Sequence, residues 1–122
     1  MVITPKTKKI RILVTKTLRE LGMPSHIKGY RYIREGIMIV YNSLEEISIT
    51  KKIYPSIAAT FDTTAFGVER AIRHAIEVSW SRGNWRLIEN IFGYSIDINK
   101  SKPTNSEFIF TIADDLKLNN RM

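Results

Sequence analysis

The spacing of apolar residues along the chain predicts helices and almost no strand. Apolar side chains recur every three or four residues, so that one face of each segment is hydrophobic and the other polar. This spacing predicts helices over residues 8–21, 28–41, 85–92 and from 104 onward. Only residues 94–98 alternate as a strand does, and one isolated strand cannot form a sheet. The pattern therefore predicts an all-α, compact single domain of about six helices.

Helix boundaries can be read from capping residues. Residues 43–46 (Ser-Leu-Glu-Glu) and residues 104–107 (Thr-Asn-Ser-Glu) both fit a capping box, in which a hydroxyl and a carboxylate satisfy backbone N–H groups at a helix start. The first box predicts a short helix from Ser43, and the second predicts the start of the last helix. Pro55 is expected in the first turn of a separate helix.

The stretch of residues 57–74 resembles a helix-turn-helix, a motif that places its second helix in the major groove of DNA. Such a unit needs a small residue in the first helix, a tight turn, and apolar residues of the second helix that pack back. These positions are occupied here by Ala58, Asp62, Val68 and Ile72. Asp adopts the left-handed conformation of such a turn more readily than most residues, and Thr64 is the expected N-cap of the second helix.

The second helix of this motif separates into two faces when it is projected at a hundred degrees per residue. Val68, Ile72, Ala75, Ile76 and Ser79 fall on the inward side. The outward side holds Arg70, Arg73, His74 and Glu77, with Glu69 at its edge. An ordinary solvated face with i,i+4 ion pairs would show the same charges. The turn pattern that precedes the helix favours DNA reading over that alternative.

Composition agrees with a polyanionic partner, which means nucleic acid or an acidic membrane surface. The 122 residues carry 19 Lys and Arg against 12 Asp and Glu, a net charge of +7 that attracts a polyanion. Residues 1–122 are expected to form one domain, in which residues 1–7 are a flexible basic segment. The sequence shows no apolar run that could span a membrane and no signal peptide, and it has no cysteine. We expect a cytoplasmic protein without a membrane partner.

The residues do not favour an enzyme. With two histidines, no cysteine, no glycine-rich phosphate loop and no paired histidines, the usual parts for nucleophilic, phosphoryl-transfer and zinc chemistry are missing. We expect no catalytic residues, no metal and no cofactor.

Five blocks of the chain resemble a known family. They are residues 26–30 (HIKGY), 68–77 (VERAIRHAIE), 80–84 (WSRGN), 92–94 (FGY) and 102–108 (KPTNSEF). Together they are similar to the DNA-binding effector domain of the sporulation response regulators, the family of stage zero sporulation protein A. The resemblance spans roughly residues 14–118. It implies a six-helix domain that binds a TGTCGAA-like box, forms head-to-tail dimers on tandem boxes, and activates or represses transcription.

The resemblance also implies roles for individual residues. Glu69, Arg70 and Arg73 carry over as base-reading candidates, and His74 as a backbone contact. Arg can donate to guanine O6 and N7, and Glu can accept from cytosine N4. Further candidates for contacts to the backbone or the flanks of the box are Thr64, Phe66, Lys102 and Asn105.

Phe66-Gly67 departs from the family, which usually has Ser-Arg at these two positions. The change removes a cation and puts Phe66 on the DNA-facing side. There it could contact a thymine methyl group, or it could simply pack against a neighbour. Gly67 is expected to weaken the first helical turn by roughly 0.5–1 kcal/mol relative to Ala.

A second departure falls on the surface that, by the resemblance, contacts the sigma factor of RNA polymerase. Trp85, Leu87 and Glu89 replace residues of other sizes and charges, whereas Phe92 is retained. Trp85 and Leu87 have two alternative interpretations, as core residues or as a subunit contact, and the core is the simpler one.

The resemblance also implies that family members carry a receiver domain with a phosphorylated aspartate. We expect none within these 122 residues, so phosphorylation is not expected to control the effector within this sequence. The sequence is then either an excised effector domain or a natural single-domain relative. Two alternatives to a specific regulator stay open. One is an interaction protein that pairs with and antagonises a full-length sporulation regulator, and the other is a charge-driven binder without sequence preference.

Overall fold

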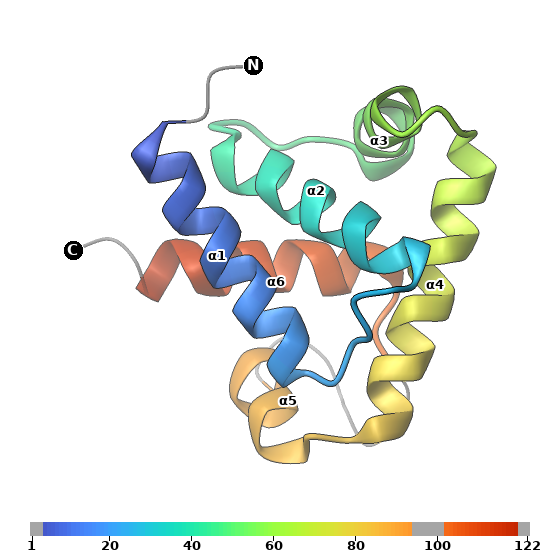
Figure 1. Cartoon of the computed structure of the whole chain (residues 1–122). Coiled ribbons are helices and arrows are strands. Elements are labelled where there is room, and N and C mark those ends of the chain that lie inside the picture. The colour runs from blue at the N-terminus through green and yellow to red at the C-terminus, as the bar shows by residue number, and fades with distance from the viewer. Residues whose placement is uncertain (1–3, 94–101, 120–122) are drawn as a thin grey trace.

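A computed structural model describes residues 4–93 and 102–119 of the chain (Figure 1). Every regular element in these two ranges is a helix, which confirms the all-α prediction. The elements are α1 (Pro5–Glu20), α2 (Lys28–Asn42), a short π-helix (Ile49–Ile53), α3 (Tyr54–Thr60), α4 (Ala65–Arg82), α5 (Trp85–Phe92) and α6 (Asn105–Asn119). The strand-like residues 94–98 lie outside the described residues.

The first helix begins earlier than the apolar spacing predicts. The hydroxyl of Thr4 accepts a hydrogen bond from the Thr7 backbone N–H at 3.1 Å, and Pro5 occupies the first turn. A capping hydroxyl and a proline with its φ already near the helical value both favour a helix start at this point. Residues 5–7 therefore belong to α1, and their assignment to a flexible segment is wrong.

The predicted helix from Ser43 is also wrong. Ser43 is the C-terminal cap of α2 and has extended backbone angles, and its hydroxyl donates to the Glu45 carbonyl oxygen at 2.7 Å. This local bond holds the chain in a bend, because it offers the backbone an alternative to helix. The chain turns helical again only at the π-helix Ile49–Ile53, which leads directly into α3 with Pro55 in its first turn, as predicted.

Helix α2 packs directly on α4, and a glycine allows the contact. A Cβ atom at Gly29 would overlap the backbone carbonyl oxygen of Ala71 and come within 2.6 Å of the Ala75 Cβ. Only glycine lets the two backbones approach this closely. The contact fixes the position of α4 from its inner side.

The last helix crosses the centre of the molecule beneath α2 and closes the core (Figure 1). Its predicted apolar face is confirmed, with all five of its members buried: Phe108, Ile109, Ile112, Ala113 and Leu116. Its predicted capping box is also confirmed. The Thr104 hydroxyl accepts from the Glu107 N–H at 3.1 Å, and the Glu107 carboxylate accepts from the Thr104 N–H at 2.9 Å.

No helix in the two described ranges is long and apolar enough to cross a membrane.

Candidate nucleic-acid interface

Helices α3 and α4 are joined by a tight turn of the kind that the helix-turn-helix prediction requires. Asp62 adopts a left-handed conformation with φ of 52°, and the Thr63 N–H donates to the carbonyl oxygen of the buried Ala58 at 2.9 Å. The Thr64 hydroxyl then accepts from the Gly67 N–H at 3.0 Å and caps α4. The predicted roles of Asp62 and Thr64 in this turn are confirmed. Because its hydroxyl caps the helix, the main role of Thr64 is to hold the first turn of α4 in position.

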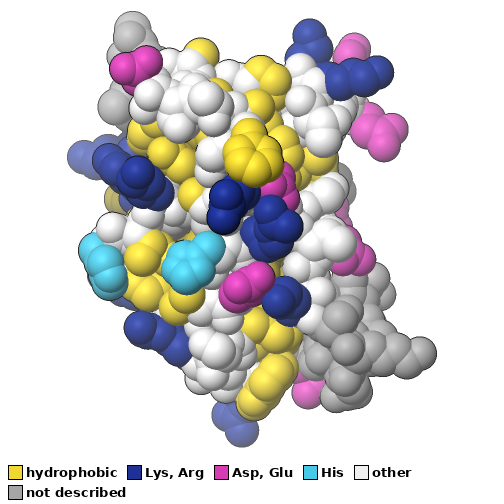
Figure 2. All heavy atoms as spheres, turned by 90° about the vertical axis from the view of Figure 1, so that its right-hand side faces the viewer, with side chains coloured by type: hydrophobic (Ala, Val, Ile, Leu, Met, Phe, Trp, Pro, Cys, Tyr) yellow, Lys and Arg dark blue, Asp and Glu magenta, His cyan; other side chains and the backbone are white. Residues whose placement is uncertain are grey.

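The two faces of α4 are those predicted from the sequence. Its five buried residues are Val68, Ile72, Ala75, Ile76 and Ser79. Arg70, Arg73, His74 and Glu77 are exposed, and Glu69 is half-buried. Figure 2 shows that the side of the molecule on which α4 lies carries cations and carboxylates close together rather than a uniform basic patch.

Two of the cations on this side are paired with carboxylates. The Arg73 Nη2 lies 2.8 Å from the Glu69 Oε2, and the Lys102 Nζ lies 3.3 Å from the Glu77 Oε1. The four side chains are between 32% and 52% exposed. Each pair therefore stabilises the protein by only about 0–1 kcal/mol. An incoming phosphate or base can therefore displace these partners at small cost.

Arg70 has a different neighbour. Its guanidinium carbon lies over the ring of Phe66, 5.5 Å from the ring centroid, in cation–π geometry. The Phe66 side chain is 68% exposed, so the ring is not part of the core. Phe66 does contact a neighbour, but that neighbour is one of the base-reading candidates.

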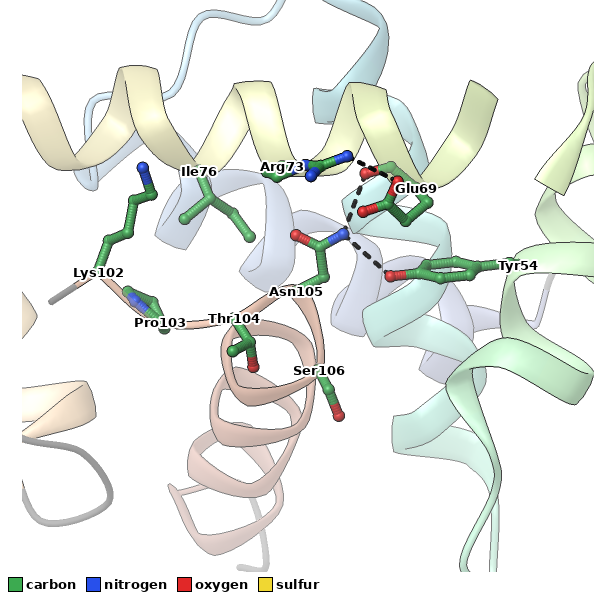
Figure 3. Close-up of a pocket in the computed structure, with 9 residues that line it drawn as sticks. All are labelled: Tyr54, Glu69, Arg73, Ile76, Lys102, Pro103, Thr104, Asn105 and Ser106. Atoms are coloured by element: carbon green, nitrogen blue, oxygen red, sulfur yellow. Dashed lines mark hydrogen bonds and ion pairs between the residues drawn. The ribbon is translucent and has the colours of Figure 1, made fainter. Parts of the chain in front are cut away.

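A hydrogen-bonded junction holds the N-terminus of α6 against α4 and α3 (Figure 3). The Asn105 Nδ2 donates to the Tyr54 hydroxyl at 2.9 Å and to the Glu69 carbonyl oxygen at 3.0 Å. Both amide hydrogens of Asn105 are thus used inside the protein, whereas a contact to a phosphate needs a donor. Asn105 is therefore better placed to position Glu69 than to bind the DNA backbone itself.

Tyr54 is a member of this junction that the sequence did not single out. Burial raises the pKa of its hydroxyl, and the hydroxyl oxygen accepts from the Asn105 amide. A tyrosine next to a proline at a helix start gives no pattern from which this role could be predicted.

A hollow of about 430 Å³ lies beside the junction. Figure 3 shows Lys102 and the start of α6 facing α4 across it. It is lined by Tyr54, Glu69, Arg73, Ile76, Lys102, Pro103, Thr104, Asn105 and Ser106. Within residues 4–93 and 102–119, no three His, Cys, Asp or Glu side chains are grouped as metal ligands. The polar groups of this hollow suit hydrogen bonding and charge contacts.

Helix α5 presents the residues assigned to the sigma-factor surface in two different ways. Trp85 is 53% exposed and meets Trp80 edge-on, with 6.3 Å between ring centroids, so its interpretation as a core residue is wrong. Leu87 is half-buried and packs against the core, whereas Glu89 is exposed.

Phe92, by contrast, is completely buried. Its ring lies between Trp80, at 5.3 Å, and Phe108, at 5.4 Å. A partner on the surface cannot reach this side chain in the folded domain. Its retention is explained by the core, which its aromatic ring fills, and it is not available as a polymerase contact.

The fold and the exposed face of α4 define a helix-turn-helix domain of the DNA-binding class. A comparison with known protein families points the same way: the family described as "Sporulation initiation factor Spo0A C terminal" matches residues 14–116. The chain belongs to this family, whose members are DNA-binding effector domains of sporulation regulators.

Proposed function

We propose that this chain is a sequence-specific, double-stranded DNA-binding transcription regulator of sporulation-type genes. It reads a TGTCGAA-like box by placing the N-terminal half of α4 in the major groove. The observation that carries the proposal is the exposed face of α4, which presents Arg70, Arg73 and His74 immediately after a capped helix-turn-helix turn.

The chemistry of each exposed side chain determines whether it contacts a base or a phosphate. Arg70 and Arg73 donate to guanine O6 and N7, and Glu69 accepts from cytosine N4 once Arg73 has turned from it to a base. His74 and Lys102 contact phosphates, which fix the register of the protein on the duplex without carrying sequence information. Asn105 and Thr64 hold the ends of this surface in place through their bonds to Glu69 and Gly67.

On tandem boxes, two copies of the protein bind head to tail and contact each other.

Trp85 and Glu89 on α5 are exposed and lie at the far end of α4 from the turn. We assign them, with the half-buried Leu87, to a contact with a polymerase sigma factor. An exposed tryptophan is a frequent anchor of protein interfaces.

Fluorescence anisotropy tests the proposal. A labelled duplex with tandem TGTCGAA boxes is compared with a scrambled duplex of equal length and composition, each at two salt concentrations. We expect tight binding to the box that survives at the higher salt, and weaker, steeply salt-dependent binding to the scrambled duplex. Equal affinity for the two duplexes would contradict specific reading of this box.

Two features favour a second candidate, an interaction protein that antagonises a full-length sporulation regulator. The reading surface has two of its cations paired with carboxylates, and Phe66-Gly67 replaces a Ser-Arg pair that supplies another cation. Both features lower the attraction to DNA. Such an antagonist would form a complex with the full-length regulator even after the change Arg70→Ala, whereas a DNA-reading regulator would lose its function.

A further inference from the structure

Phe66 stands at the point where this chain departs from its family, and its ring has a specific neighbour. It lies in the first turn of α4, four residues before Arg70, and the two side chains share one side of the helix. The Arg70 guanidinium carbon is 5.5 Å from the centroid of the ring. Resting on the proposed function, we propose that Phe66 is a positioning residue that holds the Arg70 guanidinium in the orientation needed to read guanine.

The two arginines of the reading face are held in chemically different ways. Arg73 donates an N–H to the Glu69 carboxylate at 2.8 Å, and this hydrogen bond must break before the donor can reach a base. Arg70 lies over an aromatic ring instead, and no ion pair joins it to a carboxylate among the described residues. A ring attracts the cation through its π-electrons and leaves the in-plane N–H donors free.

Free donors in a fixed orientation are what bidentate recognition requires. Guanine presents O6 and N7 side by side in the major groove, and a guanidinium must meet them with two parallel N–H groups. A long side chain that is free to rotate loses conformational entropy when it adopts that geometry, and a ring that already restricts it reduces this loss. Phe66 thus strengthens the guanine contact of Arg70.

The exposure of the ring agrees with this role. A phenylalanine with 68% of its surface exposed adds nothing to the core, and α4 already has a complete buried face without it. Its removal therefore leaves the fold intact, which makes the test clean. Leu44, which is fully exposed at 103% in the segment after α2, is a matched control for the loss of an exposed apolar side chain.

The test is a panel of duplexes in which each G·C pair of the box is replaced in turn by A·T, measured with the wild-type chain, Phe66→Leu, Phe66→Tyr and Arg70→Ala. We expect Phe66→Leu to lower affinity for the intact box about three- to tenfold. Arg70→Ala should lose discrimination at one guanine of the box. On the duplex in which that G·C pair is replaced, Phe66→Leu should bind as tightly as the wild type. Phe66→Tyr keeps the ring and should bind as the wild type does, as should Leu44→Ala.

A double-mutant cycle separates positioning from a general effect. In the Arg70→Ala background, Phe66→Leu should cause no further loss, because the residue that it positions is gone. Additive losses, or a loss spread equally over all positions of the box, would overturn the inference. A box with deoxyuridine in place of thymine tests the competing role, since a loss of affinity only in proteins that keep the ring would assign Phe66 to a thymine methyl group instead.

Failure of this inference is distinguishable from failure of the proposed function. If the wild-type chain binds the intact box and the scrambled duplex equally, the proposed function fails. If the wild-type chain discriminates and Phe66→Leu discriminates equally well at every guanine, the proposed function stands and the role of Phe66 is wrong.

Discussion

Helices α1 and α4 differ sharply in charge, and the more basic of the two is not the one that reads DNA in our proposal. Helix α1 has six cations against one carboxylate, a net charge of +5, and α4 has three arginines against two glutamates, a net charge of +1. The two helices lie on opposite sides of the molecule over most of their lengths (Figure 1). Most of the net charge of the protein therefore sits away from the proposed interface.

This difference shows that attraction and recognition are separate properties of the chain. A basic helix draws the protein toward any polyanion, with an effect that salt screens. A reading face instead needs donors and acceptors at fixed positions, and a carboxylate such as Glu69 can be part of it. Net charge alone would indicate α1 as the DNA-binding helix. The turn geometry and the two faces of α4 instead indicate α4, which has almost no net charge.

The largest effect should come from the contact that fixes α4 in place. Gly29→Ala puts a methyl group into the Ala71 carbonyl oxygen, which is backbone and cannot move aside. We expect a loss of about 3 kcal/mol in the free energy of unfolding, measured by chemical denaturation. Gly36→Ala is the control: its Cβ would approach the Ile109 Cδ1 at 3.2 Å, a flexible side-chain end. Its cost should stay below about 1 kcal/mol. Equal losses would mean that the α2–α4 contact is not special.

Removal of a base-reading arginine should come next. Arg70→Ala should cost about 1–3 kcal/mol of binding free energy on the box and little on scrambled DNA, because it removes a contact to a base. Anisotropy titrations on both duplexes measure it. Because Arg82 lies at the opposite end of α4, Arg82→Ala is the matched control. A loss of the same size on scrambled DNA would reduce Arg70 to a phosphate contact.

The next effect concerns the stability of the fold and comes from the junction at the start of α6. Asn105→Ala removes two hydrogen bonds, to the Tyr54 hydroxyl and the Glu69 carbonyl oxygen, and should lower the free energy of unfolding by about 1–2 kcal/mol. Thermal and chemical unfolding measure this loss. Ser106→Ala, at the next position on the same hollow, should change stability by less than about 0.5 kcal/mol. An unchanged unfolding curve for Asn105→Ala would show that the junction does not hold α4.

The smallest effect should come from α1, despite its charge. Charge reversal at the exposed Lys8 and Lys16 should weaken binding to the box and to scrambled DNA by the same factor, and this factor should shrink as salt is added. The ratio of the two affinities should not change. A change in that ratio would place α1 in the specific interface and would break the contrast between the two helices.

The features that the sequence predicted well are those set by local patterns. The two faces of α4, the left-handed Asp62, the Thr64 cap and the capping box of α6 depend on residues within one or two turns of each other. Spacing and capping chemistry determine such features, so they can be read from the sequence.

Some of the features that were missed depend on a competing local bond or on neighbouring rings, and others on contacts between distant parts of the chain. The box at Ser43 fits a helix start, but in the structure this serine ends α2 and bonds to Glu45. Trp85 was expected in the core, yet its side chain meets Trp80 edge-on and is 53% exposed, whereas Phe92, expected at a surface contact, is completely buried. Nor does any pattern join Tyr54 to Asn105, which are 51 residues apart.

Methylation interference tests most directly the claim that α4 reads guanine in the major groove. Dimethyl sulfate methylates guanine at N7, in the major groove, and adenine at N3, in the minor groove, so a premethylated box duplex reports which groove the protein needs. We predict that methylation of the box guanines blocks binding, that methylation of its adenines does not, and that Arg70→Ala removes the block at one guanine. Binding that tolerates guanine methylation, or that is blocked by adenine methylation alone, would contradict the account.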